Sequence, residues 1–252
     1  MDSGFYSAYA GLAARMDALD VVANNLANIS TVGFKAQHEF YRSFSAWLQP
    51  SLTTPINQAV NQYGILGGAS LDLSNGSFAP TGNDTDLALQ NPGFFTIQTK
   101  NGLRYTRAGN FSLNAQRQLV TAQGDLVMSE QGPILNPILR PIQIPEGQLS
   151  ISPDGTISVD GTLVAKLKIT DFPPNTALTM EGHSYFVAPE NTVKPAAEVN
   201  VRQGSLETSN SDPVMGTVAL IEVERTAGLM EKALSIFHNE FNRVAAQQLS
   251  VV

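Results

Sequence analysis

The sequence predicts an α+β fold: discontinuous N- and C-terminal helices form a coiled-coil unit, and an all-β domain of short strands is inserted between them. Apolar residues repeat in heptads over residues 3–28 and again over 213–249, and between them turn signals recur among short alternating stretches. We divide the chain into an N-terminal helix (1–35), an irregular connector (36–80), a β domain (81–203) and a C-terminal helix (204–252).

The N-terminal helix carries large apolar side chains at alternating intervals of four and three residues. This spacing is typical of a coiled-coil interface. Its other faces are mostly Ala, Gly and Val, which indicates close packing on several sides. Ser3 is the expected N-cap, and Gly33 is expected to end the segment. The heptad positions are Phe5, Tyr9, Leu12, Met16, Leu19, Ala23 and Leu26.

The C-terminal helix is predicted to begin after Asp212 as its cap, with Pro213 in the first turn. Its heptad positions are Leu220, Val223, Ala227, Met230, Leu234, Phe237, Phe241 and Val244. Other apolar residues lie outside this pattern: Val214, Val218, Ile221, Leu229 and Ile236. A two-stranded coil would leave them in water, and each would forgo roughly 1.5–3 kcal/mol of burial. More than one partner is therefore indicated, although periodicity alone equally allows an antiparallel helix pair packed on its own globular domain.

The middle of the chain shows strand and turn signals. Asn101-Gly102 separates two apolar stretches and predicts a hairpin, and 152–155 reads Ser-Pro-Asp-Gly, a second tight turn. Residues 163–169 alternate like one half-buried strand. The connector contains Gly64-Ile-Leu-Gly-Gly68, which lacks the Gly-Lys-Ser/Thr ending of a phosphate loop and is interpreted as a flexible link.

Composition excludes several classes of function. The net charge is −7 and the 15 Lys and Arg are scattered, which argues against nucleic acid as a partner. No stretch approaches the roughly 20 apolar residues of a membrane-spanning helix, so no membrane insertion is expected. Charged residues interrupt the N-terminal apolar residues, so we expect no cleaved signal peptide. There are no cysteines, hence no disulfides.

No pattern predicts catalysis, a metal site or a cofactor. His38-Glu39 begins like a zinc-protease motif, but position 42 is Arg rather than His. Asp84 and Asp86 are better interpreted as turn residues before a strand than as a calcium loop, because no Glu stands where an EF-hand requires one. We therefore expect that the chain is not an enzyme.

One segment resembles the N-terminal signature of the flagellar rod and hook protein family. It contains Asn24, Asn25, Leu26, Ala27, Asn28, Gly33, Phe34 and Lys35. Further matches follow in the family's order: Pro-Thr-Gly-Asn at 80–83 before Asp-Leu-Ala-Leu at 86–89, Gly-Phe-Phe at 93–95, Tyr-Thr-Arg-Ala-Gly-Asn-Phe at 105–111 and Gln-Gly-Ser-Leu-Glu-Thr-Ser-Asn at 203–210. The resemblance covers nearly the whole chain.

The resemblance implies a structural subunit of the flagellar basal-body rod in the periplasm, which transmits torque. Its partners would be copies of itself, other rod proteins and the flagellar type III export apparatus. The terminal helices would form an inner coiled-coil core, and their heptad positions are the expected assembly interface. The Met-Asp start, the length and the middle β segments fit the proximal rod type best, with the distal type as alternative. The C-terminal helix departs from the usual rod pattern at 224–230, which lacks the Arg-Ala-Tyr-Glu run common in the distal type. A stand-alone β binding module with a helical oligomerisation stalk is the other alternative.

Overall fold

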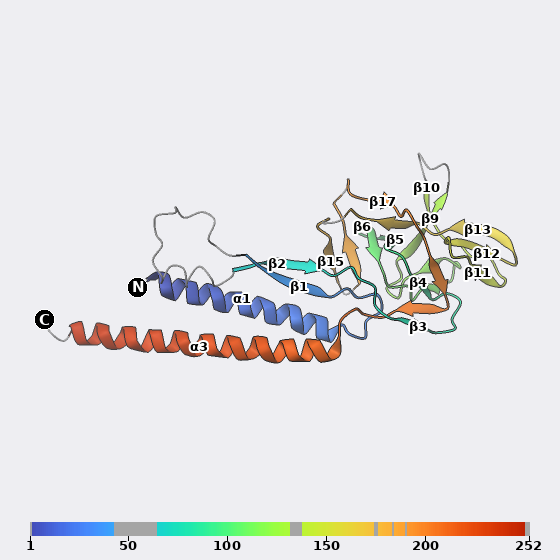
Figure 1. The fold of residues 1–252 in the computed structure, drawn as a ribbon. Helices are drawn as coiled ribbons and strands as arrows, with labels where there is room; N and C mark the ends of the chain where they lie inside the picture. The colour runs from blue at the N-terminus through green and yellow to red at the C-terminus, as the bar shows by residue number, and fades with distance from the viewer. Residues whose placement is uncertain are drawn as a thin grey trace. The chain divides into compact units, whose positions relative to one another are not determined.

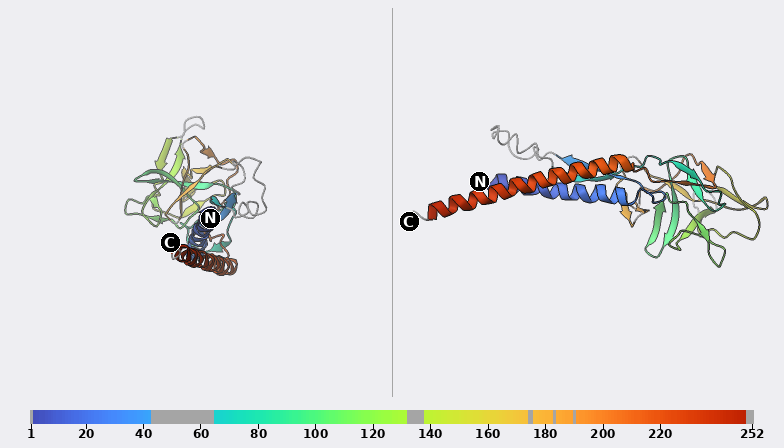
Figure 2. Two further views of the ribbon diagram at one scale, coloured as in Figure 1. Left: turned by 90° about the vertical axis from the view of Figure 1, so that its left-hand side faces the viewer. Right: turned by 90° about the horizontal axis from the view of Figure 1, so that it is seen from below.

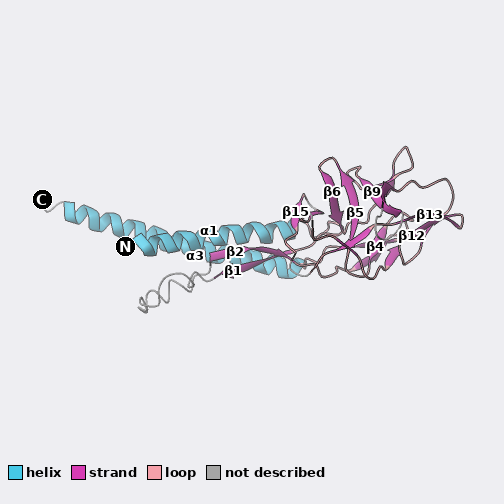
Figure 3. Cartoon of the chain, turned by 90° about the horizontal axis from the view of Figure 1, so that it is seen from above, coloured by secondary structure: helices cyan, strands magenta, loops and turns pink. Residues whose placement is uncertain are grey.

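The computed structural model describes residues 2–42, 65–131, 138–173, 176–182, 184–189 and 191–249. The chain divides into two compact units (Figure 1). The helical unit comprises Met1–Ala27, Gln37–Leu71 and Asp212–Val252. The β unit comprises Asn28–Ala36 and Asp72–Ser211. In Figure 3 the two long helices belong to the first unit and most of the strands to the second.

The helical unit contains α1 (Asp2–Ala27) and α3 (Pro213–Leu249), which run side by side in opposite directions (Figures 1 and 2). Gly11 lies against the Met230 thioether, and Gly216 lies against Leu26. Residue numbers therefore rise along α1 where they fall along α3. The two residue numbers in each contact add up to 241 for Gly11 with Met230 and to 242 for Leu26 with Gly216. These two contacts define the register of the antiparallel pair.

The predicted start of α3 is confirmed at the level of its hydrogen bonds. Asp212 Oδ1 accepts the backbone N–H groups of Val214 at 2.8 Å and Met215 at 3.0 Å. These are two of the donors that the first helical turn leaves without an intrahelical acceptor. At the other end of the chain the helix begins at Asp2, one residue before the expected cap Ser3.

The covered face of α1 differs from the expected one. Gly11, Ala14 and Ala18 are the most buried described positions of α1, whereas Tyr9 is 61% and Met16 is 50% exposed. Small side chains let neighbouring backbones approach closely and gain dispersion contacts. The face of α1 with Gly and Ala is therefore buried, and the face with the larger Tyr9 and Met16 stays exposed. Leu12, Leu19 and Leu26 are half-buried at its margin.

On α3 the buried and half-buried residues include the predicted heptad positions as far as Leu234. Ala227 is buried, and Leu220, Val223 and Met230 are half-buried. The five apolar residues predicted to lie outside that pattern are all exposed. The side chains of Phe5, Phe237, Phe241 and Val244 lie outside the described part of the chain.

The expected irregular connector contains strands. β1 (Gln37–Arg42) and β2 (Ile65–Leu71) pair antiparallel, with Gln37 opposite Leu71. Both strands contact α1, because an isolated two-stranded sheet is marginal in water and needs a packing surface. Residues 43–64 of the expected connector lie outside the described residues. The composition of this segment predicted a flexible connector, but its two ends pair as strands although they are far apart in the sequence.

The β unit is built from short antiparallel strands. Its largest described sheet has the order β15–β16–β6–β5–β9–β8–β7, with β10 pairing β9 and β14 pairing β5 and β17. These strands are β15 (Thr179–Glu181), β16 (Tyr185–Val187), β6 (Gly102–Thr106), β5 (Phe94–Thr99), β9 (Leu126–Gln131), β8 (Leu119–Val120), β7 (Ser112–Leu113), β10 (Ile138–Pro141), β14 (Ile169–Asp171) and β17 (Lys194–Pro195).

Three smaller sheets complete the described part of this unit. β11 (Leu149–Ile151), β12 (Thr156–Val159) and β13 (Thr162–Lys166) form one of them. The other two join distant segments: β18 (Val201–Gln203) with β4 (Leu87–Leu89), and β19 (Ser205–Glu207) with β3 (Phe78–Pro80). The C-terminal end of the β unit is thus hydrogen-bonded to its beginning.

Two predicted turns are confirmed. β5 and β6 form the expected hairpin: Gly102, with φ of 101°, is the first residue of β6 and pairs with Thr99 across Lys100-Asn101. Gly155 N–H donates to Ser152 O at 2.9 Å, and Ile151 pairs with Ile157. The single strand expected at 163–169 is instead divided between β13 and β14. Leu167 between them pairs with Ser129 of β9, so the chain changes its partner strand there.

A buried core fills the β unit. Its members include Leu87, Phe95, Ile97, Leu119 and Ile157, each with 0% exposure. The core draws on several of the sheets, so their inner faces share one apolar interior. Among the described residues, no helix has the length and apolar character needed to cross a membrane.

We predict that Asp212→Ala destabilises the start of α3 by about 1 kcal/mol, since the Val214 and Met215 N–H groups lose their acceptor. Amide hydrogen exchange at these two positions should accelerate. Asp212→Asn keeps a side-chain oxygen in place and serves as the control. Equal exchange in the wild type and the alanine variant would contradict the assigned cap.

Candidate functional site

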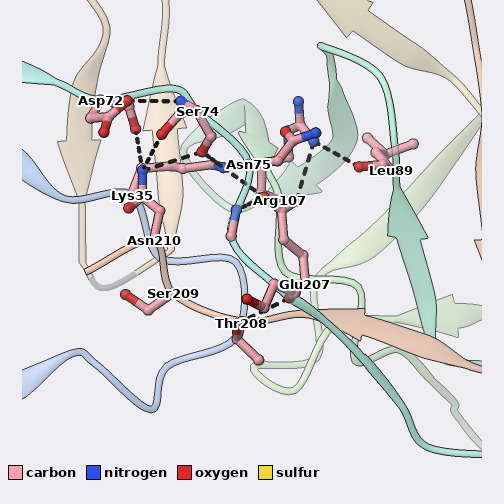
Figure 4. Close-up of polar contacts among 12 residues, drawn as sticks. Lys35, Asp72, Ser74, Asn75, Leu89, Arg107, Glu207, Thr208, Ser209 and Asn210 are labelled. Atoms are coloured by element: carbon pink, nitrogen blue, oxygen red, sulfur yellow. Dashed lines mark hydrogen bonds and ion pairs between the residues drawn. The ribbon is translucent and has the colours of Figure 1, made fainter. Parts of the chain in front are cut away.

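Three charged side chains from distant parts of the sequence meet inside the β unit (Figure 4). Lys35 follows the turn after α1, Arg107 follows β6, and Glu207 ends β19. Lys35 Nζ lies 2.6 Å from Glu207 Oε1, and an Arg107 terminal nitrogen lies 3.2 Å from Glu207 Oε2. Each carboxylate oxygen thus faces its own cation. We call these three residues the ionic cluster.

The ionic cluster is withdrawn from water. The side chains of Lys35 and Glu207 are 0% exposed, and that of Arg107 is 2% exposed. Taking an ion out of water costs several kcal/mol, and only a close counter-ion with further hydrogen bonds offsets that cost. The cluster is therefore stable only when its surroundings supply those bonds.

Backbone groups supply most of them. Lys35 Nζ donates to Ser74 O at 2.5 Å, and Glu207 Oε1 also accepts Gly76 N–H at 3.0 Å. The Arg107 guanidinium donates to the carbonyls of Leu89 at 3.1 Å and Asn91 at 3.0 Å. Arg107 Nε has no hydrogen-bond partner among the described residues. The cluster is thereby hydrogen-bonded to the backbone just before β3 and to the backbone at and just after the end of β4.

Burial and charge act in opposite directions on the two cations. Burial lowers the pKa of Lys35, while Glu207 and, more weakly, Asp72 raise it. Burial likewise lowers the pKa of Arg107, against the attraction of Glu207 and Asp171. The two basic groups also repel each other, which lowers the pKa of Lys35 further. Glu207 is the charge that allows both cations to remain in the interior.

Close backbone contacts surround the ionic cluster. Gly33, with φ of 66°, donates its N–H to Glu207 O at 2.8 Å. A Cβ at Gly33 would lie 2.3 Å from Ala108 N, so only glycine fits between these segments. Gly109 is similarly confined, because a Cβ there would lie 1.7 Å from Leu87 O. The cluster is thus set in directly packed backbone.

Asn210 ties the same segments together. Its Oδ1 accepts Ala36 N–H at 2.7 Å, and its Nδ2 donates to Asp72 O at 2.9 Å (Figure 4). Residues just after α1 are thereby bonded to residues just before α3. The sequence division placed 28–35 and 204–211 with the helical ends, whereas these residues lie in the β unit. Their hydrogen bonds to β-unit backbone explain the difference.

The residues of the N-terminal signature take separate positions. Asn25 Nδ2 donates to Gln37 O at 2.7 Å and its Oδ1 accepts Gln37 N–H, so it holds the start of β1. Asn28 begins a turn in which its carbonyl accepts Thr31 N–H at 3.0 Å. Phe34, next to Lys35, is 0% exposed. Among the predicted assembly residues whose side chains the structure describes, none joins the ionic cluster.

The described residues offer little for catalysis. A depression of about 300 Å³ in the β unit is lined by Asn28, Thr31, Val32, Ala108, Asn110, Gln123 and Ser184. This lining contains no carboxylate, imidazole or amine that could act as a general base. Nearby in sequence, burial raises the pKa of Tyr185 to about 12, so its hydroxyl stays protonated at neutral pH. Among the described residues, no group of three His, Asp or Glu side chains could hold a metal ion.

All three segments of the ionic cluster lie within the family matches found in the sequence, but the pairing of their charged residues was not predicted. The available signal was a charged residue inside each otherwise uncharged match: Gly-Phe-Lys at 33–35, Tyr-Thr-Arg-Ala at 105–108 and Ser-Leu-Glu-Thr at 205–208. Because Lys, Arg and Glu are almost never fully buried unless paired, their pairing could have been proposed from these positions.

We predict that Glu207→Gln lowers the free energy of unfolding by about 3–5 kcal/mol, because two buried cations lose their counter-charge. Denaturant unfolding followed by near-ultraviolet circular dichroism would measure it. Glu181→Gln is the matched control, since Glu181 pairs with Arg104 at a more exposed site, where the two side chains are 42% and 14% exposed. Similar losses in the two variants would show that the ionic cluster has no special role.

A second prediction concerns Gly33. Gly33→Ala and Gly82→Ala both place a Cβ at positive φ, 66° and 73°. Only the first meets backbone, because nothing lies within 4 Å of a Cβ at Gly82. Gly82→Ala should cost about 1–2 kcal/mol from conformation alone, and Gly33→Ala several times more. Equal unfolding midpoints would contradict the close approach of Gly33 to Ala108.

Comparison with known proteins agrees with these features. Residues 5–35 match the model described as "Flagella basal body rod protein". Residues 88–159 match the model described as "Flagellar hook protein FlgE/F/G D1 domain". The first match contains Lys35 and the second contains Arg107, two members of the ionic cluster.

Individual relatives extend the match to nearly the whole chain. The flagellar basal-body rod protein FlgF of Caulobacter vibrioides is 30% identical over 97% of this chain and 98% of its own length. FlgF of Mesorhizobium japonicum is 31% identical over 91% of this chain and 93% of its own. The rod protein FlgG of Borreliella burgdorferi is 26% identical over 95% and 96%. These relatives are structural proteins, which confirms the prediction that the chain is not an enzyme. The chain belongs to the flagellar basal-body rod protein family and is of the FlgF type.

Proposed function

We propose that this chain is a structural subunit of the flagellar basal-body rod, that it assembles with copies of itself and other rod proteins through α1 and α3, and that it transmits torque. Family membership supports the rod assignment. The observation that carries the assembly role is the exposed apolar side of α3. Val214, Val218, Ile221, Leu229 and Ile236 are 54–69% exposed on this single helix.

Such exposure is unusual for a monomer in water. Each of these side chains would gain roughly 1.5–3 kcal/mol on full burial. Contiguous exposed apolar side chains mark surfaces that bind another protein. Met215 adds a further exposed side chain, at 67%. The α3 helix therefore has one side directed to α1 within the chain and another side available to neighbouring subunits.

Within one chain, α1 and α3 pair as an antiparallel coiled coil in this proposal. The contacts of Gly11 with Met230 and of Leu26 with Gly216 support it, as does the burial of Ala227 at a predicted heptad position. Leu220, Val223, Met230 and Leu234 would complete the α3 side of the interface. The other predicted assembly residues, including Phe237, Phe241 and Val244, would extend it toward the C-terminus.

Export supplies the order of events. The chain would pass unfolded through the flagellar type III export apparatus, without a cleaved signal peptide, and reach the periplasmic rod. Isolated helices are marginal in water, so the terminal helices would become fully ordered only when neighbouring subunits cover them. The β unit has its own core and ionic cluster and would fold without neighbours.

Hydrogen exchange tests this order of folding. In the purified monomer, amides of the β unit should be protected, and amides of α1 and α3 should exchange rapidly. Incorporation into the rod should then protect the helices. Uniform protection of the free monomer would sink the proposal that helix folding is coupled to assembly.

Substitution on α3 tests the assembly role. Leu234→Asp places a charge on the half-buried side of the helix and should abolish incorporation and motility while the β unit still folds. Ser235→Asp introduces the same charge at the adjacent exposed position and should incorporate normally. Microscopy of swimming cells and immunoblots of purified basal bodies would report both. Normal motility of the Leu234 variant would count against the proposed role.

A further inference from the structure

An exposed stripe runs along α1 on the side that its own chain leaves uncovered. Its positions alternate at intervals of four and three residues: Tyr9, Ala13, Met16, Asp20, Ala23 and Ala27. This is heptad spacing, which a straight stripe for another helix requires. Apart from the two large residues Tyr9 and Met16, the stripe is small, and Asp20 is its one charge. We call it the α1 stripe.

A second exposed stripe runs along α3. Its positions are Val214, Val218, Ile221, Arg225, Leu229, Lys232 and Ile236. Five are large and apolar and two are basic. Neither Arg225 nor Asp20 forms an ion pair within the described part of the chain. We call this set of seven α3 positions the α3 stripe.

The two stripes are complementary in charge and in size. Docking two α3 stripes together would bring only basic charges, Arg225 and Lys232, into the interface, and docking two α1 stripes would bring only the acidic Asp20. Like charges placed face to face are costly, so the mixed pairing is favoured. The alanines of the α1 stripe also leave room for the branched side chains of the α3 stripe.

We propose that the α1 stripe of one copy docks antiparallel on the α3 stripe of a second copy, with Asp20 opposite Arg225. This deepens the proposed function, on which it rests, by naming the surfaces that meet. The same chain cannot supply the partner, because both stripes remain exposed while its own α1 and α3 pack together.

The register follows from the Asp20–Arg225 pair, whose residue numbers sum to 245. At sums of 244 or 245, four further pairs then join two apolar positions. The pairs are Ala27 with Val218, Ala23 with Ile221, Met16 with Leu229 and Tyr9 with Ile236. Ala13 meets Lys232, whose aliphatic stem can cover it. At the register found within one chain, with sums of 241 and 242, Asp20 would instead face Ile221 or Glu222.

The two registers differ by about three residues, or roughly 4.5 Å along the helix axis. Neighbouring copies would therefore be staggered by that distance. The contact is also heterologous, since each copy offers an α1 stripe on one side and an α3 stripe on the other. Repeated heterologous contacts build rings or helical assemblies, and an axial stagger makes the assembly helical.

Cysteine cross-linking tests the register, because the chain contains no cysteine of its own. Cells lacking the native gene would express two full-length copies, one carrying Met16→Cys and the other Leu229→Cys. Any disulfide must then join two molecules. After oxidation of purified rods, we expect a covalent dimer that reducing agent abolishes. The control pair Ala13→Cys with Leu229→Cys, one helical turn out of register, should give little dimer.

Charge reversal provides an independent measurement in the same cross-linking background. Asp20→Arg or Arg225→Asp alone should lower dimer yield at least about tenfold, and the two reversals together should restore it. Failure of the double reversal to restore cross-linking would contradict the pairing.

The outcomes separate this inference from the proposed function. Rods that contain both cysteine-bearing chains but give no dimer, or as much dimer with the control pair, overturn the docking of these stripes and leave the rod assignment intact. Absence of the wild-type chain from purified rods overturns the rod assignment itself. If the first pair fails to enter rods, Ala23→Cys with Ile221→Cys tests the same register at smaller residues. Absence of dimer from rods containing that pair also overturns the docking.

Discussion

The β unit depends on the carboxylate of Glu207. It is the counter-charge to Lys35 and Arg107, both buried, and burying ions without such a partner costs several kcal/mol each. Lys35 and Glu207 are 172 positions apart in the chain. The interior therefore becomes electrostatically satisfied only when the segment after α1 and the segment before α3 have both arrived, which makes closure of the β unit a long-range and cooperative event.

The helical unit differs from the β unit because it leaves much of its apolar surface exposed. Its two helices cover only part of each other, and large apolar residues stay in water on both. A monomer stabilised by its own contacts would bury them, as the β unit buries its core. In the proposed function an exported subunit would benefit from this difference, because one part of the chain could fold alone while the other gained its remaining stability from neighbours.

The family signature spans both units. Asn25 and Leu26 act in the helical unit, one on the start of β1 and the other against Gly216. Gly33 and Lys35 act in the β unit, one by fitting against Ala108 and the other through Glu207. The signature is therefore the segment in which the chain passes from the helical unit to the β unit.

The sequence alone determined what local chemistry dictates: the start of α3 at its Asp212 cap, the hairpin at Gly102, the largely half-buried heptad side of α3 and the family. Tertiary structure decided which face of α1 is covered, the pairing of β1 with β2, the unit boundaries and the ionic cluster. Periodicity records that a face is apolar but not which neighbour covers it. Burial of a charge depends on partners far away in sequence, so Lys35 acquires its role only when Glu207 reaches it.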